Sequence, residues 1–316
     1  MDKPLWMWAV FLGIVLVLLV LDLGVFHRKQ KEIGVRESLT TSAIYICIGL
    51  LFGLFVWHEL GADRGREYLT GFLIEKTLAM DNIFVISLIF THLAIPRKYQ
   101  HRVLFWGILG VIVLRGIMIG LGATLVAEFS WVLYIFAAFL IFTGIKMLMV
   151  DESHEMGESK LLNWISRRFR VTKELDGQKF FVTRYDENTG KYARYMTPLM
   201  VALIMVEITD LVFAVDSVPA IFAITTDPYV IYTSNIFAIL GLRALYFALA
   251  AIIHRFHYLK YALAAVLVFI GGKVFVASFL GMEKFPASIS LGVTVSLLAA
   301  GILYSLYKTR GKKADA

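Results

Sequence analysis

About nine apolar runs of membrane-spanning length follow one another along the chain. They lie near residues 5–26, 39–57, 69–91, 103–126, 131–149, 197–224, 231–252, 259–280 and 287–307. An α-helix needs about 20 apolar residues to cross the hydrocarbon core of a bilayer. Hydrophobic residues make up 59% of the 316 positions, more than a soluble domain usually holds. The sequence therefore predicts an all-α, polytopic membrane protein with about nine transmembrane helices.

The basic residues between these runs predict how the chain is oriented. Of the 31 Lys and Arg residues, 22 fall in one set of alternating loops, four in the other set and five inside the runs. Because cytoplasmic loops carry the excess positive charge, we expect the N-terminus outside and the C-terminus in the cytoplasm of a bacterial inner (plasma) membrane protein. The run at 5–26 is too long for a typical signal-peptide core and is expected to be the first span. The spread of basic residues argues against nucleic-acid binding.

Three sequence features occur twice in the same order. The pairs are Glu75-x5-Asp81 with Asp210-x5-Asp216, Leu114-Arg115-Gly116 with Leu242-Arg243-Ala244, and Phe142-x-Gly144-x-Lys146 with Phe269-x-Gly271-x-Lys273. Three matches in register indicate a duplication, and three spans per copy would invert the second copy in the membrane. The predicted organisation is two N-terminal helices (1–68), a first three-helix repeat (69–149), a cytoplasmic loop (150–196), a second three-helix repeat (197–280) and a last helix with a basic tail (281–316).

The loop at 150–196 contains two patterns of its own. Apolar residues between 161 and 169 form a stripe beside the arginines at 167, 168 and 170, which is typical of a helix lying on an anionic membrane surface. Two aromatic and β-branched runs flank a turn at 186–190 and predict a β-hairpin. We interpret the loop as a solvated connector, and a regulatory sensor is the alternative.

Acidic residues lie deep inside two of the apolar runs. Glu75 and Asp81 are in the third run, and Glu207, Asp210 and Asp216 are in the sixth. A charge near the bilayer centre costs at least a few kcal/mol, so these groups need partners. One interpretation is a set of ion pairs with Lys76, Arg115 and Arg243 that links the helices. The other is a cation site, which we favour because five acids face three deep bases, whereas Lys146 and Lys273 can extend to the interface.

Helical geometry predicts which of these side chains meet. Glu75 and Asn82 are seven residues apart, as are Asp210 and Ser217, so each pair shares one helix face. Glu207 and Asp210 are neighbours at i and i+3. Asp81 and Asp216 point about 120° away from these faces in an unbroken helix. We therefore expect a break or kink near Asp216, caused by Pro219, that turns this aspartate inward.

The available ligands favour a hard divalent cation. Carboxylates, the Asn82 amide and the hydroxyls of Thr209 and Ser217 suit Mn²⁺, Ca²⁺ or Mg²⁺. All seven histidines lie in loops or near span ends, and Cys47 is the only cysteine, so an intrachain disulfide is excluded. With no nucleotide-binding loop or haem-type histidine pair within the spans, we expect neither an organic cofactor nor enzymatic activity. Because burial disfavours the charged form of a carboxyl group, protons are the expected coupling ion. The oligomeric state is left open.

The same motifs resemble the TerC family of membrane proteins, especially its Alx-like members. The resembling stretches include LDLGV at 21–25, TGFLIEKTLAMDN at 70–82, residues 134–146 and 198–228, and TSNIFAILGLR at 233–243. The resemblance implies export of Mn²⁺ from the cytoplasm. It carries the family's acidic motifs to Glu75, Asp81 and Asn82, and to Glu207, Asp210, Asp216 and Ser217. The alternative is a cation-binding membrane stress or redox modulator, of the tellurium-resistance type, that does not transport.

Overall fold

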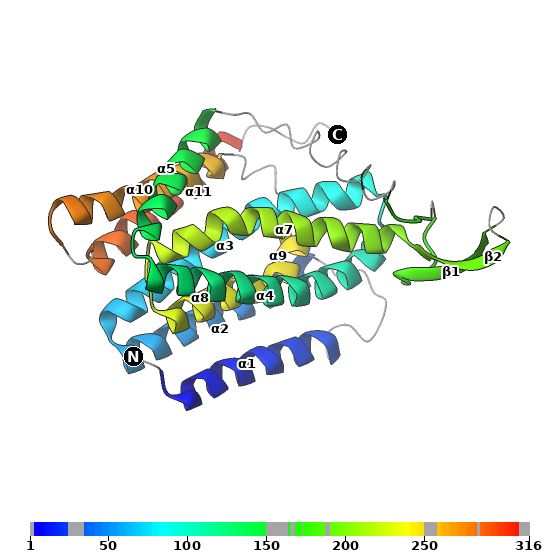
Figure 1. Cartoon of the computed structure of the whole chain (residues 1–316), viewed down its shortest axis with the longest axis horizontal. Coiled ribbons are helices and arrows are strands. Elements are labelled where there is room, and N and C mark those ends of the chain that lie inside the picture. Colours follow the sequence, from blue (N-terminus) through cyan, green and yellow to red (C-terminus); the bar gives the residue numbers. More distant parts are fainter. Residues whose placement is uncertain are drawn as a thin grey trace.

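The computed structural model describes residues 3–24, 35–149, 164, 168–172, 174–186, 190–249, 258–282 and 285–309. The described part is a bundle of helices with one β-hairpin, which confirms the predicted all-α membrane fold (Figure 1). The helices are α1 (Leu5–Gly24), α2 (Val35–Leu60), α3 (Ala62–His92), α4 (Arg97–Glu128), α5 (Val132–Met149), α7 (Pro198–Phe222), α8 (Pro228–Leu240), α9 (Leu242–Leu249), α10 (Leu259–Phe279) and α11 (Ala287–Thr309).

Seven described helical segments are long and apolar enough to cross a membrane. They correspond to α2, α4, α5, α7, α8 with α9, α10 and α11. The other two expected spans coincide with α1, whose apolar part is shorter, and with α3, which carries several charged residues. The expected total of nine spans therefore stays a prediction.

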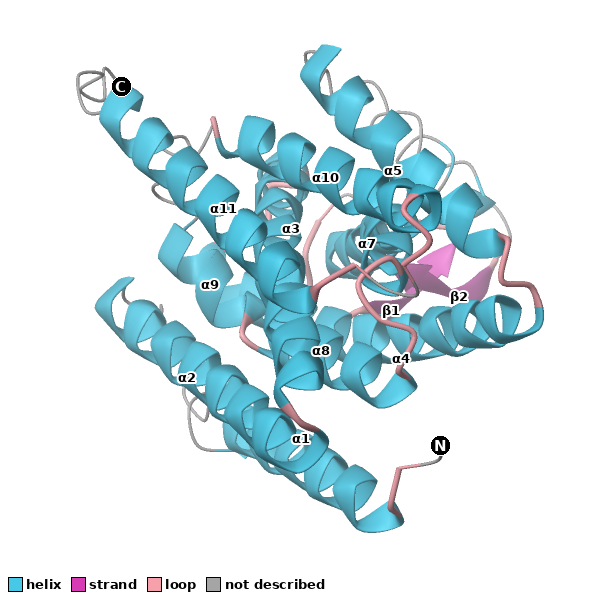
Figure 2. Ribbon diagram, turned by 90° about the vertical axis from the view of Figure 1, so that its left-hand side faces the viewer, coloured by secondary structure: helices cyan, strands magenta, loops and turns pink. Residues whose placement is uncertain are grey.

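Helix α3 lies in the interior of the bundle and contacts α2, α7, α8 and α11. On one side, α1 and α2 pack against α8 through an aromatic cluster around Phe11, Phe52 and Phe237. Figure 2 shows α1 and α2 on the opposite side of the bundle from α5 and α10. The outer helices expose large apolar side chains such as Leu51 and Leu121, which is expected of surfaces that face lipid.

The connector before α7 contains the expected hairpin. Strand β1 (Phe181–Asp186) pairs antiparallel with β2 (Lys191–Met196), from Phe181 opposite Met196 to Asp186 opposite Lys191. The prediction of a hairpin is therefore confirmed. The hairpin projects beyond the end of the bundle where α7 begins (Figure 1). The amphipathic helix expected between 161 and 170 lies mostly outside the described residues.

A helix break near Asp216 is contradicted by the structure, whereas a kink in a continuous helix stays a prediction. Helix α7 continues from Pro198 to Phe222 with Pro219 inside it. Pro219 lies in the last turn of the helix, where its missing N–H removes one hydrogen bond to the carbonyl of Val215. The carbonyl of Pro219 still accepts a hydrogen bond from the N–H of Ala223 at 3.0 Å. A proline this close to the end of a helix removes too little of the hydrogen-bond ladder to break it.

Helices α5 and α10 cross at two glycines whose surroundings are reciprocal. A Cβ added to Gly144 would lie 2.8 Å from the carbonyl oxygen of Ala264 and 2.7 Å from Val268. A Cβ added to Gly271 would lie 2.5 Å from the carbonyl oxygen of Ala137 and 2.8 Å from Ile141. Each residue of one contact is 127 positions from its counterpart in the other. Such reciprocity is what a local two-fold axis between duplicated segments produces, although the inverted repeat itself stays a prediction.

Candidate cation site

Arg115 on α4 is the centre of a buried polar cluster between α3, α4 and α7, and it is 1% exposed. Its Nε and Nη2 atoms donate to Oδ2 and Oδ1 of Asp210, each at 3.1 Å. Its Nη1 atom donates to the carboxylate of Glu75 and, at 2.8 Å, to the hydroxyl of Ser217. The expectation that Arg115 pairs with the acidic residues is confirmed.

Asn82 connects α3 to the same carboxylate. Its Nδ2 atom donates to Oδ1 of Asp210 at 3.1 Å. Because Glu75 and Asn82 both reach this cluster, as do Asp210 and Ser217, the seven-residue spacing predicted the shared helix faces correctly. The Asn82 side chain is 5% exposed, and its Oδ1 atom has no hydrogen-bond partner among the described residues. Buried polar atoms without a partner are rare, so this oxygen is a candidate ligand for an ion or a water molecule.

A cavity of about 20 Å³ lies beside Asn82 and Asp210. This volume holds about one water molecule or an ion of similar size. The polar side chains in its lining are Asn82, Thr209 and Asp210, and all three carry oxygen. The rest of the lining is Ile86, Leu104, Gly107, Ile108, Val111, Val206 and Leu242. Side chains that carry a carboxylate, a hydroxyl and an amide therefore line one small cavity whose wall is mostly apolar.

Glu207 lies one helical turn before Asp210 on α7, and its carboxylate packs against α4 at Gly110. A Cβ added to Gly110 would collide with both carboxylate oxygens and the carbon between them. Within the described residues, the Oε2 atom of Glu207 is buried without a hydrogen-bond partner. This carboxylate is therefore a second acidic group beside the cavity helices, and it forms no ion pair with a described cationic side chain.

Lys76 does not pair with a carboxylate among the described side chains. Its Nζ atom donates to the carbonyl oxygen of Ala238 at 2.8 Å, near the C-terminal end of α8. This span is interrupted, since α8 ends at Leu240 and α9 begins at Leu242. A cation at the end of a helix satisfies a free carbonyl and interacts favourably with the helix dipole, which explains the placement. Arg243 is buried in the first turn of α9.

Two further positions of the expected site can be placed only in part. Asp81 and Asp216 belong to α3 and α7, but their side chains lie outside the described set. Among the side chains that are described, no three His, Cys, Asp or Glu residues are close enough to hold a metal ion.

The sequence patterns did not single out Asn235 on α8, which is fully buried beside Glu75. Its side-chain amide interacts with the Glu75 carboxylate, and an amide inside an apolar run was the signal available.

Lys273 also differs from expectation. It was expected to extend to the interface, yet it is 6% exposed, and its Nζ atom donates to the hydroxyl of Ser290 on α11 at 2.8 Å. Helix α11 packs on α10 and covers this lysine, whereas its counterpart Lys146 on α5 is exposed. The sequences around the two lysines are similar, so they do not predict that a further helix buries one lysine and leaves the other exposed.

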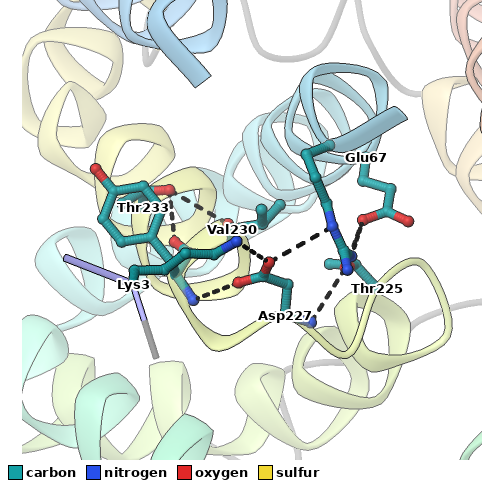
Figure 3. Close-up of polar contacts among 8 residues, drawn as sticks. Lys3, Glu67, Thr225, Asp227, Val230 and Thr233 are labelled. Carbon is teal, nitrogen blue, oxygen red and sulfur yellow. Dashed lines mark hydrogen bonds and ion pairs between the residues drawn. The ribbon is translucent and has the colours of Figure 1, made fainter. Parts of the chain in front are cut away.

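A second polar cluster joins the N-terminal segment, the start of α3 and the α7–α8 connection (Figure 3). Asp227 pairs with Lys3 at 3.0 Å and with Arg64 at 3.5 Å. Arg64 also pairs with Glu67 at 2.7 Å, and the Thr225 hydroxyl donates to the same Glu67 carboxylate at 2.6 Å. The Asp227 side chain accepts a hydrogen bond from the N–H of Tyr229 at 3.1 Å and so caps α8. This outer cluster ties together three segments at the end of the bundle predicted to face outward.

Comparison with known families shows that one family pattern covers most of the chain. The pattern described as the integral membrane protein TerC family matches residues 60–313, which include every described helix from α3 onward. The chain belongs to the TerC family. All residues of the Arg115 cluster fall in the matched region of this TerC protein, and the resemblance inferred from its motifs is confirmed.

Relatives extend over nearly the whole TerC chain. An uncharacterized membrane protein of Rickettsia bellii is 52% identical over 302 residues, covering 95% of this chain and 97% of that protein. An uncharacterized membrane protein of Myxococcus xanthus is 47% identical, with 96% and 93% covered. A protein of Escherichia coli named putative membrane-bound redox modulator Alx is 43% identical, with 92% and 91% covered. No solved structure matches the chain.

Proposed function

We propose that this TerC protein is a secondary transporter that exports Mn²⁺ from the cytoplasm across a bacterial inner membrane. The observation that carries the proposal is the small buried cavity lined by Asp210 and by Asn82, whose Oδ1 atom has no hydrogen-bond partner among the described residues. Polar groups inside a membrane bundle are costly, and they commonly mark the path of an ion. Glu75 and Ser217, which meet Asp210 through Arg115, would complete the binding region.

The ligand chemistry supports a hard cation. The side chains around the cavity offer oxygen from a carboxylate, an amide and a hydroxyl, a set that suits Mn²⁺, Mg²⁺ and Ca²⁺. Asp81, Asp216 and Glu207 are further candidate ligands from the sequence. The family resemblance favours Mn²⁺ among these ions. The protein is then a transporter rather than an enzyme, with no organic cofactor.

Transport would require the two repeats to move around the ion. The reciprocal crossing of α5 and α10 at Gly144 and Gly271 supports a two-fold relation between the repeats. In inverted-repeat transporters the substrate lies between the repeats, and one repeat rocks against the other. The Asp210–Arg115 and Asp210–Asn82 contacts lie between helices of the two predicted repeats, as such a site requires. Protonation of a released carboxylate is the proposed coupling step.

Reconstitution into vesicles tests the function directly. Full-length protein should move Mn²⁺ across the membrane when a proton gradient is imposed, and Asp210→Asn should reduce the rate by at least about tenfold. Asp63→Asn is the matched control, because Asp63 is an exposed carboxylate near the start of α3. Failure of the wild type to move Mn²⁺ under any imposed proton gradient would contradict the proposal. Full transport by Asp81→Ala or Asp216→Ala would remove those residues from the site.

The name of the Escherichia coli relative, putative membrane-bound redox modulator, favours a second candidate, a membrane modulator that does not transport. The cation it would bind is the one inferred from the acidic motifs. The hairpin of β1 and β2 would be its output, since it projects from the bundle (Figure 1). Removing residues 150–196 while keeping Mn²⁺ transport would argue for the transporter. A visible absorption spectrum of the purified protein would reveal a bound redox chromophore and so test the redox part of that name.

A further inference from the structure

The guanidinium of Arg115 occupies the space between the two carboxylates that a cation would bridge. Its Nε and Nη2 atoms contact both oxygens of Asp210, and its Nη1 atom contacts Glu75. This two-pronged contact matches the geometry of a carboxylate and leaves neither Asp210 oxygen without a donor. The same Asp210 lines the cavity with Asn82, so the arginine and a small ion in the cavity would share this carboxylate.

A divalent cation and the Arg115 guanidinium would repel each other if both contacted Glu75 and Asp210. The Arg115 guanidinium contacts both carboxylates, so a divalent cation bound to the same oxygens would lie within a few ångströms of it. Like charges a few ångströms apart repel strongly where water is scarce. A guanidinium does not lose its proton in proteins, so titration cannot relieve the repulsion. A divalent cation that takes Glu75 and Asp210 as ligands therefore competes with the arginine for them.

We propose that Arg115 is a tethered counter-cation that competes with the divalent cargo for Glu75 and Asp210. This inference rests on the proposed transport function. In the cargo-free protein the arginine neutralises the two acids, so they are not left as uncompensated charges inside the bundle. The cargo must displace the guanidinium in order to bind. This competition lowers the affinity of the protein for the cargo and favours its release. Arg115 is then a positioning residue that sets how tightly the cation is held.

A purely structural role predicts a different result from the same substitution. If Arg115 only held α3, α4 and α7 together, its removal would disorder the acids and weaken cation binding. If it competes, its removal would free both acids and strengthen binding. Coupling between close buried charges commonly changes affinity by a factor of about ten or more. The sign of the change in affinity therefore separates the two roles.

The test measures Mn²⁺ binding to full-length protein in detergent, from the electron paramagnetic resonance signal of free Mn²⁺. We expect Arg115→Met to bind Mn²⁺ at least about tenfold more tightly than the wild type and to export it more slowly in vesicles. Arg102→Met is the control on the same helix, because Arg102 contacts Gln178 at 3.3 Å, away from the acids. It should leave the affinity unchanged.

Two further variants cover the case in which Arg115→Met does not fold. Arg115→Lys keeps the charge but loses the two-pronged contact, so its affinity should rise by less than tenfold. Arg115→Ala should bind Mn²⁺ tightly, and millimolar methylguanidinium should weaken that binding whereas tetramethylammonium at equal concentration should not. Equal or weaker Mn²⁺ binding by folded Arg115 variants, with binding by the wild type, overturns the competition alone. No Mn²⁺ binding by the wild type or by any variant overturns both this inference and the proposed function.

Discussion

The carboxylate of Asp210 on α7 accepts two hydrogen bonds from the guanidinium of Arg115 on α4, each 3.1 Å long. The contact joins helices that the sequence assigns to different repeats. It is also buried, so its two charges depend on each other rather than on water. The stability of the bundle and the chemistry of the candidate site therefore rest on the same pair.

Asp210→Asn is expected to destabilise the protein as well as impair transport. The substitution weakens the two-pronged contact with Arg115, and because Glu75 still pairs with the guanidinium, the loss should stay below the roughly 3–5 kcal/mol that an unpaired buried charge costs. Asp63→Asn removes a surface pair with Arg66 that is 2.9 Å long, and exposed pairs contribute at most about 1 kcal/mol. Thermal unfolding in detergent should lower Tm clearly for the first variant and little for the second. Equal Tm values would mean that the Asp210 pair does not stabilise the bundle.

Gly110→Ala is expected to displace the Glu207 carboxylate. The new Cβ would overlap this carboxylate, which must then rotate or push α7 away from α4. Gly116→Ala is the control on α4, because no described atom outside the helix lies within 4 Å of a Cβ built there. Mn²⁺ transport should fall several-fold in Gly110→Ala and stay near the wild-type rate in Gly116→Ala. Unchanged transport by Gly110→Ala would show that the position of Glu207 is not required.

Gly271→Ala is expected to open the crossing of α5 and α10. Its Cβ would lie 2.5 Å from the backbone oxygen of Ala137, which cannot move without the helix. Overpacking of this kind costs about 1–3 kcal/mol. At the adjacent Gly272 nothing described lies within 4 Å of an added Cβ, so Gly272→Ala should be neutral or slightly stabilising. A higher Tm for Gly271→Ala than for Gly272→Ala would contradict the tight crossing.

Two substitutions at Asp227 separate its two roles in the outer cluster. Asp227→Asn keeps a side-chain oxygen that caps α8 but removes the charge facing Lys3 and Arg64. Asp227→Ala removes the cap as well and should lower the free energy of unfolding by a further 0.5–2 kcal/mol or so. The loss in Asp227→Asn should change little as salt is added, because the Asp227 side chain is only 6% exposed and buried ion pairs are screened much less than exposed ones. If the two variants unfold at the same temperature, the cap contributes nothing.

Hydropathy and helical phase predicted the membrane fold, the hairpin and the meeting of Glu75, Asn82, Asp210 and Ser217. These features follow from local periodicity, which a sequence displays directly. The partner of Lys76 and the burial of Lys273 depend on which helix packs beside them, and no local pattern encodes that. Helix α7 continues through Pro219 because the helix ends only three residues later, at Phe222. A sequence predicts the end of a helix only to within a few residues, so this continuity was not predictable.

The central claim is that Asp210 and Asn82 bind a divalent cation inside the bundle. Anomalous scattering from crystals of the full-length protein soaked in Mn²⁺ tests it most directly. The proposed function predicts an anomalous peak within about 2.5 Å of an Asp210 carboxylate oxygen, close to Oδ1 of Asn82. Peaks confined to surface carboxylates, with none between α3, α4 and α7, would contradict it.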